Sequence, residues 1–262
     1  NNIIFLGCGT SYFSAMMGTK YFKELCNFNT VMIFDGAEFN SNDIPKIGNT
    51  ALVFLSQSGE TKDLHRCIKI GKDKDLFLIG IVNVVDSMIA REVDCGVYLN
   101  AGREVGVAST KCFTNQVIVL ALMAIWFSQI HNINEMKRKY YIRGLRNLPN
   151  QIKKTIKSSA EQIPYIIDIV NKEHLFVLGK GCSEAIAKEG ALKIKEISYI
   201  HAEGYSGSSL KHGPFALLSN KFPVILIAPQ DEHYSKMKNV YEEIKSRDSP
   251  ILFITNKKCE IK

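Results

Sequence analysis

Short apolar runs alternate with helix-periodic segments along the first half of the chain. The apolar runs are rich in β-branched and aromatic residues, as in strands buried on both faces, and fall at 3–6, 31–34, 51–55, 76–82 and 97–99. Segments with apolar residues at helical spacing follow most of them, at 11–25, 60–73, 84–93 and 114–131. This alternation predicts a parallel sheet covered by helices on both faces.

A second series of the same kind follows a polar stretch punctuated by Asn, Gly and Pro. Its expected elements are helix 151–171, strand 174–178, helix 183–199, strand 222–228, helix 232–246 and strand 250–255. We interpret the punctuated stretch, 136–150, as a connecting region between two domains, 1–135 and 151–262.

The second series repeats the first in register. The matched segments are 4–11 with 176–183, 53–58 with 225–230, and 79–83 with 252–256, at offsets of 172, 172 and 173 residues. Such a repeat predicts two tandem units of one α/β fold, each a flavodoxin-like three-layer sandwich with a parallel sheet flanked by helices. The first unit continues well past Asn83, whereas six residues follow Asn256. By this symmetry the second unit is expected to be truncated at its C-terminus.

Composition narrows the class of protein. The 262 residues are 46% hydrophobic and 23% charged, as in a soluble globular protein with room for two cores. The seven cysteines lack C-x-x-C spacing, which favours reduced thiols and a cytoplasmic location over disulfides or a metal site. The longest apolar run, 117–127, is much shorter than the roughly 20 residues that span a bilayer. We expect it to be a buried helix and expect no membrane association.

Basic residues crowd one region of this chain, whose net charge is +7. They are Lys137, Arg138, Lys139, Arg143, Arg146, Lys153, Lys154 and Lys157. A surface for single-stranded nucleic acid would need interleaved aromatic residues, which here are limited to Tyr140 and Tyr141. A solvated helical face is therefore favoured, and no nucleic-acid partner is expected.

A hydroxyl-rich turn, Ser56-Gln57-Ser58-Gly59-Glu60-Thr61, lies between the apolar run 51–55 and a predicted helix. The first N–H groups of a helix have no internal partners and its dipole favours negative charge, so such a turn can bind phosphate without Lys or Arg. An ordinary polar helix cap is the alternative. The repeat counterpart, 228–233, carries Pro and acidic residues instead of hydroxyls. Only the first unit is therefore expected to bind phosphate.

Two other segments are expected at the same edge of the first sheet, because ligands of open parallel sheets bind at the carboxyl ends of strands. They are Gly7-Cys8-Gly9-Thr10-Ser11 and the loop 101–111. This convergence strengthens the phosphate interpretation. The first segment has Tyr12 where a dinucleotide fingerprint needs its third glycine. We therefore expect no nucleotide and no other cofactor.

The second unit supplies ionisable groups. Glu189, Lys193 and Glu196 share one helix face, a spacing that by itself favours a solvated charge ladder. Glu196 is close to a mostly apolar helix end, where a desolvated carboxylate would suit proton transfer at carbon. His212 lies in the expected rigid turn Leu210-Lys211-His212-Gly213-Pro214, and an imidazole there could open or close a sugar ring.

Together these segments resemble the sugar isomerase (SIS) half of the glutamine:fructose-6-phosphate amidotransferase family. The segments are GCGTS, SQSGET, AGREVGVASTK, EGALKIKEISYIHAEGY and LKHGP, in the family's order and over nearly the whole chain. The resemblance implies that Glu196 moves a proton between C1 and C2 of the sugar, that Lys193 assists it, and that His212 promotes ring opening in the site of a neighbouring subunit of a homodimer. The implied phosphate ligands are Ser56, Gln57, Ser58 and Thr61. The implied contacts to sugar hydroxyls are Cys8, Gly9, Thr10, Ser11, Val107 and Ser109.

The resemblance also implies a function in the intact enzyme, the conversion of fructose 6-phosphate and glutamine-derived ammonia to glucosamine 6-phosphate in amino sugar biosynthesis. Neither the family's glutaminase domain, a partner expected in the same polypeptide, nor its C-terminal lysine tail is in this sequence, and Ser209 stands where the family has glutamate. Two alternatives remain open. One is a stand-alone phosphosugar isomerase or deglycase, and the other is a sugar-phosphate-sensing regulatory module, which would not need Glu196, Lys193 or His212.

Overall fold

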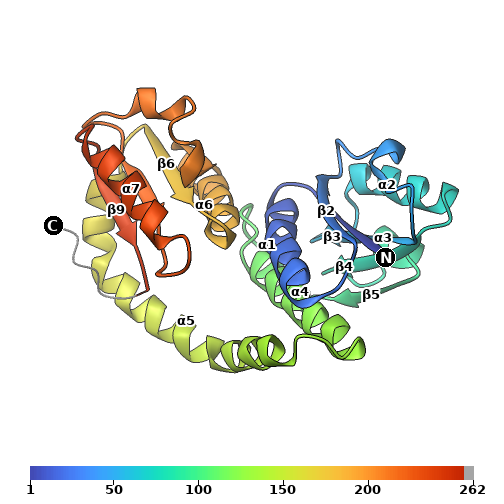
Figure 1. Ribbon diagram of the computed structural model, residues 1–262. Coiled ribbons are helices and arrows are strands. Elements are labelled where there is room, and N and C mark those ends of the chain that lie inside the picture. The colour runs from blue at the N-terminus through green and yellow to red at the C-terminus, as the bar shows by residue number, and fades with distance from the viewer. Residues whose placement is uncertain (257–262) are drawn as a thin grey trace. The chain divides into compact units, whose positions relative to one another are not determined.

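The computed structural model describes residues 1–256. The chain forms two compact units, Asn1–Leu148 and Pro149–Lys262, drawn in Figure 1. Each unit is an α/β arrangement built on a parallel sheet.

The first unit has a five-stranded sheet in the order β2-β1-β3-β4-β5. Its strands are β1 (Asn2–Gly7), β2 (Thr30–Asp35), β3 (Thr50–Ser56), β4 (Phe77–Val82) and β5 (Cys95–Tyr98). Its helices are α1 (Thr10–Leu25), the short 3-10 helix η1 (Ser41–Asp43), α2 (Lys62–Asp73), α3 (Met88–Glu92) and α4 (Lys111–Ile130). The order reverses between β1 and β3, so the loops after these two strands frame a crevice at the carboxyl edge.

Apolar residues on alternate positions of the central strands supply two cores, one on each face of the sheet. Phe5, Val53 and Ile81 face a cluster that includes α1 and α4. Leu6 and Phe54 face a second cluster with α2 and α3. Burial on both faces explains why the strands read as continuous apolar runs, as a covered parallel sheet requires.

The close contact of α1 with α4 fixes one face of the first unit (Figure 1). A Cβ added to Gly18 would lie 2.8 Å from Leu120 Cδ1, so the glycine allows the helices to approach closely. The expectation of a buried helix holds for only one side of α4, because Leu122 and Trp126 on its other side are about half exposed. By length and composition α4 is also the one described helix that could cross a membrane, but here it packs on α1.

The connecting region predicted at 136–150 is not an irregular linker. It is part of α5 (Glu135–Val170), which contains both Pro149 and Pro164. A proline inside a helix removes one backbone hydrogen bond, and the other punctuating residues, Asn and Gly, lower helix propensity by at most about 1 kcal/mol each. The basic residues of 137–157 lie along this largely exposed helix.

The second unit has a four-stranded parallel sheet in the order β7-β6-β8-β9. Its elements are β6 (His174–Gly179), α6 (Cys182–Ser198), β7 (His201–Ser206), η2 (Gly207–Ser209), η3 (Pro214–Leu217), β8 (Val224–Ile227), α7 (Tyr234–Lys245) and β9 (Ile251–Ile254). This order matches β2-β1-β3-β4 of the first unit, so the repeat is structural. Strand β7 was not predicted from the sequence. It lies at the sheet edge, is only partly buried, and its residues HAEGYS contain no apolar run.

Candidate functional site

A small polar cavity lies at the carboxyl edge of the first sheet, after β1 and β3. Its volume is about 220 Å3. It is lined by Cys8, Thr10, Ser11, Leu55, Ser56, Gln57, Ser58, Thr61, Ser109 and Gln116. The structure therefore brings together eight of the ten residues that the sequence analysis proposed as substrate contacts, from three segments far apart in the chain.

Hydrogen bonds within the turn 56–61 hold its hydroxyls in place. Ser56 Oγ lies 3.0 Å from Thr61 Oγ1 and accepts the Gly59 N–H at 2.9 Å. Ser58 Oγ accepts the Glu60 N–H at 3.1 Å. Gly59 has φ of 69°, and a Cβ there would lie 2.0 Å from Ser87 Oγ, so the turn requires glycine.

The cavity suits an anion although no lysine or arginine lines it. Thr61 is the N-cap of α2, but its side chain makes no capping hydrogen bond. The first N–H groups of α2 thus keep the partial positive charge of a helix N-terminus. The neighbouring hydroxyls add donors that can rotate toward oxygen, which is a suitable environment for a phosphate.

Gln116 of α4 is a cavity residue that the sequence analysis missed. Its Nε2 donates to Ser11 Oγ at 3.0 Å, and its Oε1 accepts from Ser14 Oγ at 2.5 Å. Gln116 and Ser14 are buried. The sequence signal for this residue was its place directly before the apolar run 117–127. An amide buried there needs hydrogen-bond partners, and polar side chains of the site can supply them.

The Cys8 thiol is a neutral group in this cavity. Burial, followed by the nearby Asp35 carboxylate, raises the pKa of Cys8 to about 11. The thiol is therefore protonated at neutral pH, which favours contact with a ligand over nucleophilic attack. The six cysteines in the described residues are all free.

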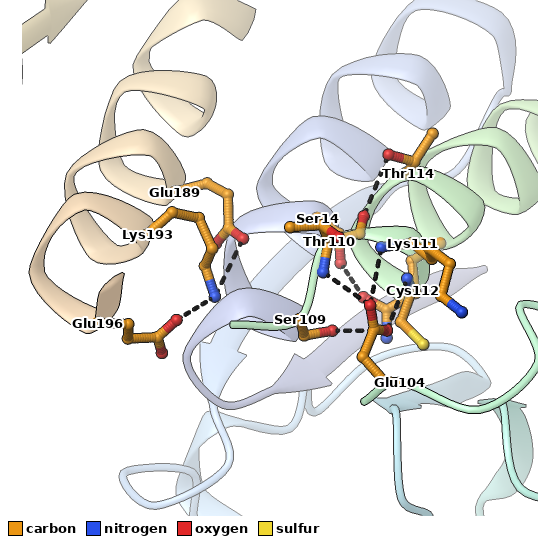
Figure 2. Close-up of polar contacts among 11 residues, drawn as sticks. Ser14, Glu104, Ser109, Thr110, Lys111, Cys112, Thr114, Glu189, Lys193 and Glu196 are labelled. Carbon is orange, nitrogen blue, oxygen red and sulfur yellow. Dashed lines mark hydrogen bonds and ion pairs between the residues drawn. The ribbon is translucent and has the colours of Figure 1, made fainter. Parts of the chain in front are cut away.

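Glu104 positions the third segment of the cavity and was not assigned a role from sequence. Its carboxylate accepts the N–H groups of Thr110 and Lys111, each at 3.0 Å, and that of Cys112 at 3.2 Å (Figure 2). It also accepts Ser109 Oγ at 3.3 Å. Glu104 thus caps α4 from within the preceding loop, which explains why the helix starts at Lys111 and not at the expected 114.

Hydrogen bonding determines the ionisation of Glu104. Burial alone would raise its pKa, but the hydrogen bonds from the Cys112 side chain and from the three backbone N–H groups outweigh burial and lower the pKa from 4.5 to about 2. The carboxylate is therefore charged at any ordinary pH. A negative charge at a helix N-terminus is stabilising.

Two of the proposed substrate contacts do not line the cavity. Val107 is 90% exposed. Gly9 is the N-cap of α1 with φ of 54°, so its contribution is to turn the chain from β1 into α1. The hydroxyls of Thr10, Ser11 and Ser109 and the thiol of Cys8, beside these residues, do line the cavity.

The three charged residues of α6 form one cluster in the second unit. Lys193 Nζ lies 3.6 Å from Glu189 Oε1 and 2.6 Å from Glu196 Oε2 (Figure 2). The side chains of Glu189 and Lys193 are 7% and 15% exposed, so this is not the solvated ladder that spacing alone favoured. Glu196, 27% exposed, pairs with Lys193.

His212 lies exposed in the turn between η2 and η3. The backbone N–H of His212 donates to the Ser209 carbonyl at 3.0 Å, and Gly213 follows with φ of 131°. Within residues 1–256, no hydrogen bond or ion pair joins the imidazole to the α6 cluster.

The counterpart of the phosphate turn in the second unit is closed by its own side chains. A Cβ on Gly181, the counterpart of Gly9, would lie 2.7 Å from the His233 ring. Asp231 Oδ1 accepts the His233 N–H at 2.8 Å. The imidazole thus occupies space that is open in the first unit. Ala228, Gln230 and His233 stand at the positions of the three hydroxyl residues of the turn 56–61. No group of three or more potential metal ligands is arranged around an ion site in residues 1–256.

A model of the SIS domain matches residues 1–126 and 168–261, the same two halves as the structural repeat. The chain belongs to the SIS domain family. It is 51% identical over 257 residues to a probable glutamine–fructose-6-phosphate aminotransferase (isomerizing) of Acanthamoeba polyphaga mimivirus, covering 98% of this chain and 42% of that protein. It is 36% identical to glutamine–fructose-6-phosphate aminotransferase (isomerizing) 2 of Homo sapiens, covering 97% and 37%.

A solved structure supports the same relationship. The C-terminal domain of glucosamine-fructose-6-phosphate aminotransferase from Francisella tularensis aligns with a TM-score of 0.90 and 31% identity, over 97% of this chain and 72% of that one. The resemblance inferred from the sequence motifs and the two-unit α/β fold are thereby confirmed. The SIS chain spans less than half the length of these two curated relatives.

Replacing Glu104 with Gln should destabilise the first unit by about 1 kcal/mol at pH 7, the size of a helix cap on a partly exposed surface. Because folding lowers this pKa, the stabilisation is present above 4.5 and is lost as pH falls toward 2. Urea unfolding followed by fluorescence of Trp126, the single tryptophan, measures the change. The difference between wild type and variant should shrink between pH 5 and about pH 3. Glu38→Gln, at an exposed carboxylate of the same unit, is the control. The capping role would be contradicted by the same stability difference at both pH values, or by an equal loss of stability in Glu38→Gln.

Replacing Lys193 with Met should destabilise the second unit by about 3 kcal/mol, because it removes the cation that is paired with the buried Glu189 carboxylate. Lys188→Met is the matched control. Lys188 pairs with Glu184 on the same helix, but Lys188 is 30% exposed against 15% for Lys193, and Glu184, at 27%, is more exposed than Glu189, at 7%. Its loss should therefore cost less than about 1 kcal/mol. Amide hydrogen exchange along α6 gives both values. Equal losses would show that burial of the Lys193 cluster is energetically unimportant.

Proposed function

We propose that this chain is the fructose 6-phosphate-binding isomerase part of a glucosamine-6-phosphate synthase. The observation that carries the proposal is the hydroxyl-lined cavity at the N-terminus of α2, with the charged cluster on α6 as its acid–base complement. The relatives at 51% and 36% identity are named for a glutamine-dependent, isomerizing reaction of fructose 6-phosphate. This supports the same substrate here.

The phosphate would bind in the turn 56–61. Ser56, Ser58 and Thr61 provide hydroxyl donors and the helix N-terminus provides N–H groups. A cavity of about 220 Å3 is below the usual size of a pocket for a whole small-molecule ligand. It suits the phosphate end and the adjacent hydroxyls, with Cys8, Thr10 and Ser109 around them. The remaining sugar carbons would extend outside the cavity.

The carbon chemistry would fall to α6. In the proposed step Glu196 removes a proton from C1 of the ketose imine and returns it to C2. The C1 hydroxyl becomes the aldehyde as its proton passes to the imine nitrogen, which becomes the C2 amine. No atom is lost in this isomerisation, so it needs a base but no oxidant or metal. Lys193, 2.6 Å from Glu196, would orient the carboxylate. His212 would promote ring opening.

The partners follow from the same proposal. A glutaminase domain in the same polypeptide would release the ammonia, and a homodimer would let His212 of one subunit act in the site of its neighbour. The exposed position of His212 and its lack of a bond to α6 support a role outside its own unit. We also propose a cytoplasmic location, consistent with six free cysteines in residues 1–256.

The α6 cluster weighs against a sensing module but does not distinguish a synthase from a stand-alone isomerase. A sensing module needs the phosphate turn but gains nothing from three largely buried charges, which are costly to keep. A stand-alone isomerase would use Glu196 in the same way and would act without a nitrogen donor. It is distinguished by a ketose–aldose assay in the absence of glutamine and ammonia.

Thr61→Val should weaken binding of fructose 6-phosphate about 10-fold or more, because it removes a hydroxyl bond to a charged group worth about 1.5–3 kcal/mol. Thr155→Val, on the exposed surface of α5, is the matched control and should leave binding unchanged. Isothermal titration with fructose 6-phosphate, and with fructose as the ligand without phosphate, provides the measurement. If both variants bind like wild type, the phosphate does not occupy the turn.

Glu196→Gln in the full-length enzyme should lower glucosamine 6-phosphate formation by about 10²-fold or more, the usual contribution of a general base. Glutaminase activity should persist, which separates loss of the base from loss of folding. Glu184→Gln, an exchange of the same kind in the first turn of α6, is the control and should retain synthesis. Normal synthesis by Glu196→Gln would rule out its role as the base.

A further inference from the structure

The turn 56–61 is bonded to a second helix besides α2, the short helix α3 (Met88–Glu92). The backbone N–H of Ile89 donates to the Gly59 carbonyl at 3.0 Å. The backbone N–H of Met88 donates to Glu60 Oε1 at 2.8 Å. A helix leaves its first four N–H groups without internal partners, and in α3 two of them are bonded to the turn.

Ser87, the N-cap of α3, adds a packing contact to these two bonds. Its side chain lies against Gly59, and the residue is 3% exposed. The Ser87 hydroxyl does not cap α3, and it has no hydrogen-bond partner within residues 1–256. The hydrogen bonds between the turn and α3 are therefore those of Gly59 and Glu60.

The rest of α3 is fixed to the first unit. Ile89 is fully buried in one cluster with Leu64 and Ile68 of α2. At the end of α3, Glu92 forms an ion pair of 2.8 Å with Lys72 of α2. A helix as short as α3 is not stable on its own in water, so it depends on these contacts. The turn is thus bonded to a segment that cannot move without disturbing the core.

Glu60 is the charged residue of the turn, and its charge has the same sign as a phosphate. Its chain neighbours Ser58 and Thr61 line the cavity, but Glu60 does not. Its carboxylate is bonded instead at the N-terminus of α3, where the helix dipole favours negative charge. At the same time its backbone N–H donates to Ser58 Oγ at 3.1 Å. One residue therefore joins α3 to a hydroxyl of the cavity.

We propose that Glu60 is a positioning residue for phosphate binding. Through its bond to Met88 it fixes the backbone that carries Ser58 and Thr61, and it holds its own charge outside the cavity. It acts without contacting the ligand. Because the ligand is the phosphate of the same substrate, this role of Glu60 rests on the proposed function.

The sign of an affinity change tests this role. If Glu60 acted only through its charge, its removal would strengthen the binding of an anion. Glu60→Ala should instead weaken binding of fructose 6-phosphate about fivefold or more, because a displaced turn loses part of its hydrogen bonding to a charged ligand. Glu60→Gln retains an oxygen that can accept the Met88 N–H and should bind like wild type. Isothermal titration of the full-length enzyme, without glutamine, measures the affinities.

Asp63→Ala is the matched control. Asp63 is an exposed acidic residue in the first turn of α2, so its removal deletes a nearby charge of the same sign. Binding by Asp63→Ala should be unchanged or tighter. In steady-state kinetics, Glu60→Ala should raise KM for fructose 6-phosphate with kcat nearly unchanged, as for a loss of binding shared by substrate and transition state. A purely structural defect would lower kcat through the active fraction and leave KM unchanged.

Unchanged or tighter binding by Glu60→Ala would overturn the positioning role. Equal weakening in Glu60→Gln and Glu60→Ala would overturn it as well, since the amide oxygen can accept the same bond. Failure of wild type to bind fructose 6-phosphate would contradict the proposed function instead. Inorganic phosphate would then be the ligand for the same variants, and equal affinities of wild type and Glu60→Ala would again rule out positioning by Glu60.

Discussion

The packing of α4 against α1 is the contact on which the candidate site depends. Gly18 lets Leu120 approach, and the approach places Gln116 within hydrogen-bond distance of Ser11 and Ser14. The same helix has Glu104 and Ser109 at its N-terminus. A cavity that looks like the product of three loops is thus held by one helix–helix contact, because buried amide and hydroxyl groups must be paired where the helices meet.

The two units keep one fold and divide the chemistry. The first unit has an open cavity with hydroxyls, whereas His233 fills the corresponding space in the second. On α6, Glu189 and Lys193 stand at the positions of Met17 and Tyr21 of α1, while Glu196 corresponds to Glu24. The charged cluster of α6 therefore differs from the corresponding face of α1 at two of these three positions. The strands of the two units keep the same order.

Much of the fold could be predicted because a covered parallel sheet leaves a strong pattern. Runs such as 51–55 must be apolar at every position when both faces are buried. The constant repeat offset also predicts two units of the same fold. The edge strand β7 lacks that pattern because it is only partly buried. The helix through 136–150 was missed because Gly144 and Pro149 lower local propensity, which a continuous 36-residue helix overrides.

The sequence by itself determined the succession of strands and helices along the chain, the family, and the chemical groups of the site. These depend on residue identity and on local spacing. Tertiary structure alone decided which groups meet. It placed Gln116 and Ser109 beside the turn 56–61 and left Val107 outside. It also showed that the spacing of Glu189, Lys193 and Glu196 produces a largely buried cluster and not a solvated ladder. Burial and contact between distant segments are properties of packing, which periodicity cannot encode.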